Sequence, residues 1–363
     1  METGVFHEDL LQEILIRLPA KSLVRFRCVC RSWYSLIASP SFISAQVVHK
    51  KKAKSYHVLL RSFNNTERKY KYKLCNDDEH LDEIMIIDFP FVSEHNDFFR
   101  IAGCVNGLVC LSDDIVEVTD TVIIWNPVIR RFLTLPKLEL NVDSSELGRS
   151  VLGFGFDSYN NDYKVIRIVY RKNPDFEARQ IEALIAIFRL SSSSWEVNRS
   201  ASVPLLDTRQ AYVNGSIHWL AYNKLMVGFD VESEELRDMT LPNSLKNANI
   251  SDLTIASWCD MLSVFENGYW FGKLSLWVMK DYGDPNSWVK QFEIESFALV
   301  RSLRKNGCVI LESIGGKLVL YNANTNQFED FKTHVEGSVR GFHMKSYLES
   351  LVLLDRLDVY SIP

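Results

Sequence analysis

The chain has 363 residues with a net charge of −5, of which 47% are hydrophobic and 24% are charged. This composition supplies a full apolar core and excludes a disordered chain, and no apolar run approaches the roughly 18 residues of a membrane-spanning helix. The first residues lack the apolar core of a secretory signal, and the seven cysteines are scattered and odd in number. We therefore expect reduced thiols and a cytoplasmic or nuclear protein that does not act at a membrane.

The amino-terminal segment has helical periodicity. Leu11, Ile14, Leu15 and Leu18 recur at spacings of three and four, and Pro19 ends this helix because its ring clashes with a continuing turn. Two further short helices are predicted, at 21–28 and 31–37. Three such helices are too small to bury their own apolar side chains, so another protein surface is expected to cover them.

A basic segment separates this helical region from the rest of the chain. Residues 1–54 hold nine Lys or Arg and four Asp or Glu, a net charge of +5, so the remaining residues carry −10. The run at 49–54 contains four lysines, a pattern found in nuclear signals and phosphate-binding patches but more typical of a solvated linker. We predict a helical domain at 1–48, a basic linker at 49–55 and a second domain at 56–363.

Three strings stand out in the helical segment: Glu8-Asp9-Leu10-Leu11-Gln12-Glu13-Ile14-Leu15, Arg17-Leu18-Pro19-Ala20-Lys21-Ser22-Leu23 and Arg25-Phe26-Arg27-Cys28-Val29-Cys30-Arg31-Ser32-Trp33. Their combination is a resemblance to the plant type of F-box. It implies docking onto a Skp-type adaptor of a cullin-based ubiquitin ligase. The implied contact or supporting positions are Leu11, Ile14, Leu15, Leu18, Pro19, Val24, Val29 and Trp33. Phe6-His7 stands where the family has Leu-Pro, which predicts a weaker start of the first helix.

Beyond residue 55 the periodicity changes to short β-strand patterns separated by turn residues such as Asn106-Gly107 and Asn214-Gly215. Two-strand units recur with aromatic anchors spaced by 63, 41, 48 and 44 residues, at Trp125, Phe188, Phe229, Trp277 and Tyr321. A period of about 40 to 50 residues is typical of a propeller blade. We predict an all-β propeller of six blades, with five or seven as alternatives, closed by pairing of strands at 56–63 and 351–360.

Four motifs stand out in this second region: Asn106-Gly107-Leu108-Val109-Cys110, Trp125-Asn126-Pro127, Gly153-Phe154-Gly155-Phe156-Asp157 with Asp162-Tyr163-Lys164-Val165, and Asn214-Gly215-Ser216-Ile217-His218-Trp219-Leu220. Together they resemble the F-box-associated, kelch-like interaction domain of plants. In overall character the chain is similar to S-locus F-box proteins and their relatives. That resemblance implies a role in pollen self-incompatibility, with a pistil ribonuclease as the target.

Catalytic and nucleic-acid-binding signatures are weak. The eight histidines form no metal-binding pair, no phosphate-binding loop or nucleophile elbow occurs, and His218 is expected to be structural. Basic residues at 61–73 interleave with Tyr70 and Tyr72, which is compatible with base stacking, but the acidic second region repels a polyanion. We interpret this stretch as an exposed edge hairpin and predict no catalytic residue, metal, cofactor or nucleic-acid partner.

The expected function is therefore that of a non-catalytic substrate-recognition subunit of a Skp–cullin–F-box ligase. Target contacts are expected on one rim of the ring, from polar inserts at 140–150, 171–178 and 281–287. The candidate residues are Asp143, Glu146, Arg149, Asp175, Glu177, Asp281 and Asp284. The acidic second region favours a basic target such as a ribonuclease. The alternatives are a receptor for another protein, and a propeller enzyme or sugar-binding module with a dispensable helical cap.

Overall fold

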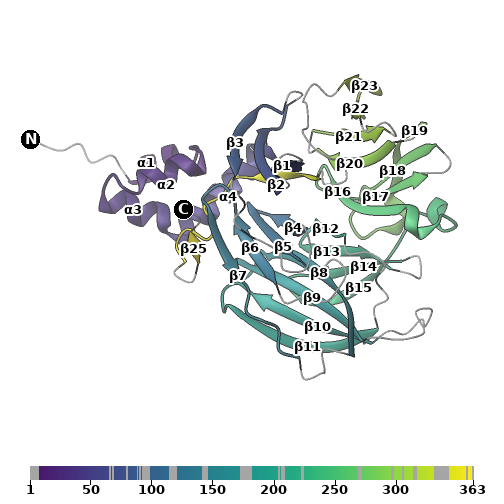
Figure 1. Ribbon diagram of the computed structural model, residues 1–363, viewed down its shortest axis with the longest axis horizontal. Coiled ribbons are helices and arrows are strands. Elements are labelled where there is room, and N and C mark those ends of the chain that lie inside the picture. The colour runs from purple at the N-terminus through teal and green to yellow at the C-terminus, as the bar shows by residue number, and fades with distance from the viewer. Residues whose placement is uncertain are drawn as a thin grey trace, which may run out of the picture.

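The computed structural model describes 19 segments of the chain: residues 8–64, 67, 69–78, 81–87, 89, 91, 99–113, 121–140, 146–171, 182–202, 205, 209–221, 225–268, 272–295, 298–304, 306–313, 317–330, 343–356 and 359–361. A group of short helices is followed by a ring of β-sheets (Figure 1). The segment Phe6-His7 and the inserts at 141–145 and 172–180 lie outside the described residues.

Four helices form the amino-terminal region, where the sequence predicted three. They are α1 (Glu8–Leu15), α2 (Ala20–Phe26), α3 (Arg31–Ala38) and α4 (Pro40–Lys52). The additional helix has a recognisable start, because the Ser39 hydroxyl accepts a hydrogen bond from the backbone N–H of Phe42 at 3.2 Å and Pro40 occupies the first turn.

Helix α4 contains much of the segment that we expected to be a basic linker. Its last turn holds His49, Lys50, Lys51 and Lys52, where positive charges meet the negative end of the helix dipole. Lys50 is only 8% exposed, whereas Lys51, Lys52 and Lys54 are exposed, so this basic run is partly helical and mostly solvated. The predicted domain limits themselves stay a prediction.

The β-region is a ring of six sheets, as predicted. The strands of each blade are given from the axis outward. Blade 1 contains β24 (His343–Leu348), β1 (Tyr56–Asn64), β2 (Lys69–Asn76) and β3 (Glu83–Ile87), blade 2 contains β4 (Arg100–Val105), β5 (Leu108–Ser112), β6 (Val122–Asn126), β7 (Arg131–Thr134) and β25 (Tyr360–Ser361), and blade 3 contains β8 (Leu147–Asp157), β9 (Asp162–Arg171), β10 (Glu182–Arg189) and β11 (Ser194–Ser202). Blade 4 contains β12 (Ala211–Val213), β13 (Ser216–Leu220), β14 (Leu225–Asp230) and β15 (Leu236–Thr240), blade 5 contains β16 (Leu253–Trp258), β17 (Met261–Gly268), β18 (Lys273–Met279) and β19 (Trp288–Glu295), and blade 6 contains β20 (Ala298–Leu303), β21 (Cys308–Ser313), β22 (Leu318–Asn322) and β23 (Gln327–Asp330).

Ring closure uses a different carboxy-terminal strand from the one predicted. Strand β24 pairs antiparallel with β1 and so completes blade 1 with the two ends of the β-region. The predicted partner segment, 351–360, instead leads to β25, which adds a fifth strand to the outer edge of blade 2. The prediction failed because 351–360 is the more apolar of the two segments, whereas β24 contains His343, Lys345 and Ser346, and strand pattern alone does not specify a partner.

The aromatic anchors occupy equivalent places in the ring. Trp125, Phe188, Phe229, Trp277 and Tyr321 all lie in the third strand from the axis of their blades. The sequence analysis missed the sixth member, Tyr72 in β2, which is fully buried and contacts Trp125 edge-on at 5.3 Å. Strand β2 pairs on both sides, with β1 and β3, so the predicted exposed edge hairpin is wrong.

The two rims of the ring differ in the elements they carry. Strands β24, β4, β8, β12, β16 and β20 lie innermost, and in a propeller such strands all run in one direction along the axis. Their far ends, the turn that joins β8 to β9 and the start of β1 therefore share one rim, which we call the F-box rim because α4 leads into β1 there. The starts of the six inner strands lie on the opposite rim, which we call the free rim.

Candidate protein-interaction sites

The apolar side chains of helices α1–α3 divide between the interior and the solvent. Leu15, Leu23 and Ile37 are at most 1% exposed and belong to one hydrophobic cluster with propeller residues such as Trp125. On the other side of α1, Leu10 is 58% exposed and Ile14 is 52% exposed. The propeller therefore covers only part of the apolar surface of these helices.

The predicted adaptor-binding residues fall into three classes of exposure. Ile14, Pro19 and Val29 are exposed. Leu11, Leu18, Val24 and Trp33 are partly buried and pack against the hydrophobic cluster. Leu15 is 1% exposed, which leaves it the supporting role and not the contact role.

Two exposed side chains were missed by the sequence analysis. Leu10 lies four residues before Ile14 and so shares its face of α1, a spacing that was available in the sequence. Tyr34 is 51% exposed, with the Arg27 guanidinium 4.3 Å from its ring centroid. We call Leu10, Ile14, Val29 and Tyr34 the outer apolar set of the helices.

Polar contacts attach the helices to the F-box rim. The buried carboxylate of Glu349, which follows β24, accepts a hydrogen bond from the backbone N–H of Ala20 at 3.2 Å. The Ser44 hydroxyl of α4 donates to the side-chain oxygen of Asn161, in the turn of another blade, at 3.2 Å. Contacts from two blades fix how the helices sit on the ring.

His57 lies beside the first of these contacts. Its Nε2 atom is 4.0 Å from Glu349 Oε1. Burial lowers the pKa of His57, and the charge of Lys50 acts in the same direction while Glu349 opposes it. A neutral imidazole is therefore favoured at the attachment of the helices.

The glycine-rich motif of blade 3 sets how closely blade 4 can approach. A β-carbon added at Gly153 would lie 2.4 Å from the ring of Trp219, and one added at Gly155 would lie 2.7 Å from Val231. Real atoms do not approach so closely, so these two positions need glycine for steric reasons. The motif therefore has a structural role in joining two blades.

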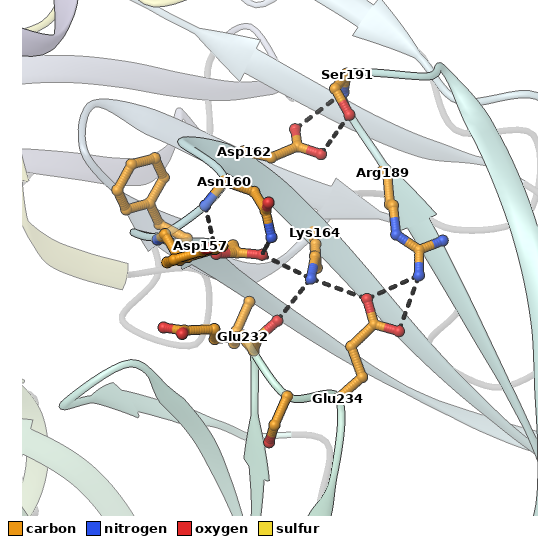
Figure 2. Close-up of polar contacts among 12 residues, drawn as sticks. Asp157, Asn160, Asp162, Lys164, Arg189, Ser191, Glu232 and Glu234 are labelled. Atoms are coloured by element: carbon orange, nitrogen blue, oxygen red, sulfur yellow. Dashed lines mark hydrogen bonds and ion pairs between the residues drawn. The ribbon is translucent and has the colours of Figure 1, made fainter.

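The second half of that motif places a buried ammonium between the same two blades (Figure 2). Lys164 Nζ lies 2.8 Å from Asp157 Oδ2, from Glu234 Oε1 and from the carbonyl oxygen of Val231. Its side chain is 3% exposed. Arg189 Nη2 donates to both carboxylate oxygens of Glu234 at 2.8 Å, which extends the network to β10.

These contacts shift the two pKa values in opposite directions. Burial disfavours the ionised carboxyl of Asp157, but hydrogen bonds from Asn160 and Lys164 outweigh burial and hold its pKa below the usual value. Burial likewise disfavours the charged ammonium of Lys164, but Asp157 and Glu234 raise its pKa overall. Both groups stay charged at neutral pH, and the network is an internal ion cluster of the fold.

A neighbouring carboxylate, Asp162, accepts hydrogen bonds from a turn of blade 3 (Figure 2). Asp162 accepts hydrogen bonds from the backbone N–H of Ser191 at 2.9 Å and from its hydroxyl at 2.6 Å. Asp162 thus ties the start of β9 to the turn between β10 and β11. Every polar residue of this motif has a structural partner.

His218 is likewise held by structural contacts. Its Nδ1 atom faces the carbonyl of Ala211 at 3.1 Å, so Nδ1 carries the proton and donates, while Nε2 accepts from the hydroxyl of Tyr282 at 2.9 Å. Burial lowers its pKa to about 4. Within the described residues, no group of three metal-binding side chains occurs.

The predicted target-binding residues do not share a rim. Asp143, Asp175 and Glu177 lie outside the described residues. Glu146 and Arg149 lie at the start of β8, on the free rim, and the Arg149 guanidinium is 5.1 Å from the Tyr170 ring centroid. Asp281 and Asp284 lie in the turn between β18 and β19, which the antiparallel alternation of strands places on the F-box rim.

The turn at 281–287 forms hydrogen bonds within itself. Asp284 caps a short 3-10 helix, η4 (Pro285–Ser287), by accepting from the backbone N–H of Asn286 at 2.8 Å. The side chains of Asp281 and Asp284 are exposed. Their role in target binding stays a prediction, and they lie on the opposite rim from Glu146 and Arg149.

No helix in the part of the chain that the structure describes is long and apolar enough to cross a membrane.

Comparisons with known proteins agree with the two-part architecture. The F-box domain family matches residues 6–44, and the family of the F-box associated beta propeller domain matches residues 49–333. Among curated proteins of Arabidopsis thaliana, an F-box/kelch-repeat protein is 28% identical over 95% of this chain and 94% of its own length. The F-box protein CPR1 is 27% identical over 98% of this chain and 90% of its own length. The chain therefore belongs to the F-box proteins that carry an F-box associated beta propeller domain.

Proposed function

We propose that this protein is the substrate-recognition subunit of a Skp–cullin–F-box ubiquitin ligase, in which the helices bind the adaptor and the propeller binds the target. The observation that carries this proposal is the exposure of Leu10 and Ile14 on one face of α1, although the opposite face of the helices packs on the ring. Apolar side chains that remain in water beside a completed core mark a surface for a protein partner.

The propeller contributes position and not bond chemistry in this proposal. The residues of its most distinctive motif are engaged in packing and ion pairs, and members of the family are typically non-catalytic subunits. A rigid ring attached to the helices at Glu349 and Asn161 holds a bound target at a fixed place relative to the adaptor. Fixing two reactants in one complex raises their effective concentration.

Capture of a purified plant Skp-type adaptor by the full-length chain tests the proposal. Ile14→Asp places a charge in the proposed contact and is expected to weaken adaptor binding by at least about 30-fold, as for a central interface residue. Val48→Asp is the matched control, because Val48 is 50% exposed on α4 and outside the outer apolar set. Leu15→Asp is unsuitable, since Leu15 lies in the core and the change would disrupt the fold.

Equal capture by the Ile14→Asp variant and the parent chain would show that α1 is not the docking surface. Equal loss with Val48→Asp would show a general effect of added charge. Either result overturns the proposal, provided that thermal unfolding shows both variants to be folded.

The finer prediction of an S-locus protein that recognises a basic ribonuclease stays a prediction. Its support is the net charge of −10 beyond residue 54. Expression confined to pollen would favour it, whereas expression throughout the plant would favour a receptor for another target.

A further inference from the structure

The residues that follow the ring-closing strand lie across the F-box rim. Residues 349–356, which we call the carboxy-terminal strap, come directly after β24, whose last residue Leu348 pairs with Tyr56 at the start of β1. Four side chains of the strap are at most 4% exposed, those of Ser350, Leu351, Leu353 and Leu354. Connecting segments usually run over the surface of a protein, so this one is unusual in its burial.

The strap supplies part of the hydrophobic core beneath the F-box helices. Leu351 and Leu354 belong to the same cluster as Leu15 of α1 and Leu23 of α2. Because these helices are too short to bury such side chains among themselves, their core depends in part on the carboxy-terminal end of the chain. The buried carboxylate of Glu349, at the start of the strap, adds its hydrogen bond to α2.

Two turns of blade 2 hold the strap in place. The amide nitrogen of Asn126, which is fully buried at the end of β6, donates to the carbonyl oxygens of Ser350 at 3.0 Å and of Val352 at 2.9 Å. A β-carbon added at Gly107 would lie 2.4 Å from the Ser350 hydroxyl, so the turn between β4 and β5 also touches the strap. The two sequence motifs to which Asn126 and Gly107 belong therefore both contact this segment.

The far end of the strap reaches blade 3. Arg356 donates from Nη1 to the carbonyl oxygen of Leu190 at 2.5 Å and from Nη2 to the Ser193 hydroxyl at 2.6 Å, in the turn between β10 and β11. Leu353 lies in a second hydrophobic cluster, which is shared by blades 2 and 3. The strap therefore connects the helices to three blades at once.

These contacts depend on closure of the ring. Glu349 follows Leu348 directly, and the pairing of β24 with β1 brings Leu348 to the F-box rim. That pairing joins the two ends of the β-region. Without it the strap has no fixed place, and the helices lack Leu351 and Leu354 as part of their core.

We propose that the carboxy-terminal strap is a latch that fixes the F-box helices to the ring when the ring closes. A chain with an open ring then has loosely held helices and does not keep a bound target at a fixed place relative to the adaptor. This consequence rests on the proposed function, whereas the fixing of the helices is a property of the chain itself. Because coupling between two sites is reciprocal, the helices in turn stabilise the closed ring.

Native-state hydrogen–deuterium exchange of the full-length chain tests the latch. Leu351→Ala removes a fully buried side chain of the strap and is expected to speed exchange in α1–α3 by at least about 30-fold. Leu276→Ala is the matched control, because Leu276 is equally buried in β18 of blade 5. It removes the same side chain from the ring, away from the strap, and should leave exchange in the helices unchanged.

The reverse coupling is tested from the side of the helices. Leu23→Ala weakens the contact of α2 with the strap and should speed exchange in β24 and β1 about tenfold, with no change in β16 and β17 of blade 5. Arg356→Met loosens the far end of the strap without removing a core side chain, so it serves where Leu351→Ala does not fold. It should speed exchange in α1–α3 about tenfold.

Two results would overturn the proposal. One is exchange in α1–α3 of the strap variants that is no faster than in Leu276→Ala, which would show that the helices respond only to the overall stability of the ring. The other is unchanged exchange in β24 and β1 of Leu23→Ala, which would show that closure does not depend on the helices. Ile14→Asp should leave exchange in β24 and the strap as in the parent chain, so failure of adaptor docking and failure of the latch are measured separately.

Discussion

Apolar side chains are usually buried and charged side chains usually exposed, and the F-box helices and the junction of blades 3 and 4 each depart from one half of this rule. The helices leave Leu10 and Ile14 largely in water, whereas the blade junction buries the charges of Lys164 and Asp157. At the junction every buried charge has a partner at about hydrogen-bond distance within the chain. At the helices no described residue covers Leu10 and Ile14 in a comparable way, so the surface that covers them is expected to belong to another molecule.

The largest expected effect breaks the blade junction. Lys164→Met removes the ammonium and leaves Asp157 and Glu234 buried without their shared partner. Loss of one partner from a buried ion cluster costs about 3–5 kcal/mol, so the free energy of unfolding should fall by that amount. Urea denaturation followed by tryptophan fluorescence measures it, and a change under about 1 kcal/mol would mean that the cluster contributes little.

A smaller effect is expected from the glycine contact at the same junction. Gly153→Ala puts a β-carbon against the buried ring of Trp219 and should cost about 1–3 kcal/mol through overpacking. Gly228→Ala is the matched control, because the nearest atom to its added β-carbon would be at 3.4 Å. Similar denaturation midpoints for the two variants would show that close blade packing does not require Gly153.

The hydrogen bond that Glu349 accepts from the helices should contribute less to stability than either of these contacts. Glu349→Ala removes the acceptor of the Ala20 N–H and should cost about 1 kcal/mol, the typical net value of one hydrogen bond. The expected readout is faster proteolysis in α1–α3 with unchanged unfolding of the propeller. A lowered unfolding midpoint of the propeller, with no change in proteolysis, would place the role of Glu349 within the ring.

The smallest expected effect is on the free energy of unfolding at acidic pH. The pKa of Asp157 is lowered in the folded protein, so its contribution to stability is present above the unfolded value of about 4 and is lost as pH falls through the lower folded value. The unfolding free energy should therefore fall more steeply below about pH 4 in the parent than in Lys164→Met. Parallel acid profiles for the two proteins would show that Lys164 does not hold the low pKa of Asp157.

The sequence predicted the architecture well where a signal repeats. The aromatic anchors marked equivalent strands in five blades, and Asn106-Gly107 and Asn214-Gly215 adopt the positive φ values expected of tight turns. Tyr72 was missed because its neighbours in β2 are lysines, which disguise a buried central strand as an edge. The closing strand was missed because strand partners across the whole chain are decided by three-dimensional packing.

The candidate sites were harder to predict than the fold. The family resemblance gave both Ile14 and Leu15 as contact or supporting positions, but which of two adjacent residues faces the ring depends on how α1 lies on the propeller.

Hydrogen–deuterium exchange of the full-length chain with and without a Skp-type adaptor tests the central claim most directly. The account predicts slower exchange in α1 around Leu10 and Ile14, with little change in β8 and β9 at the blade junction. Unchanged exchange in α1, or protection confined to the propeller, would contradict the claim that the exposed face of the helices is the adaptor-binding surface.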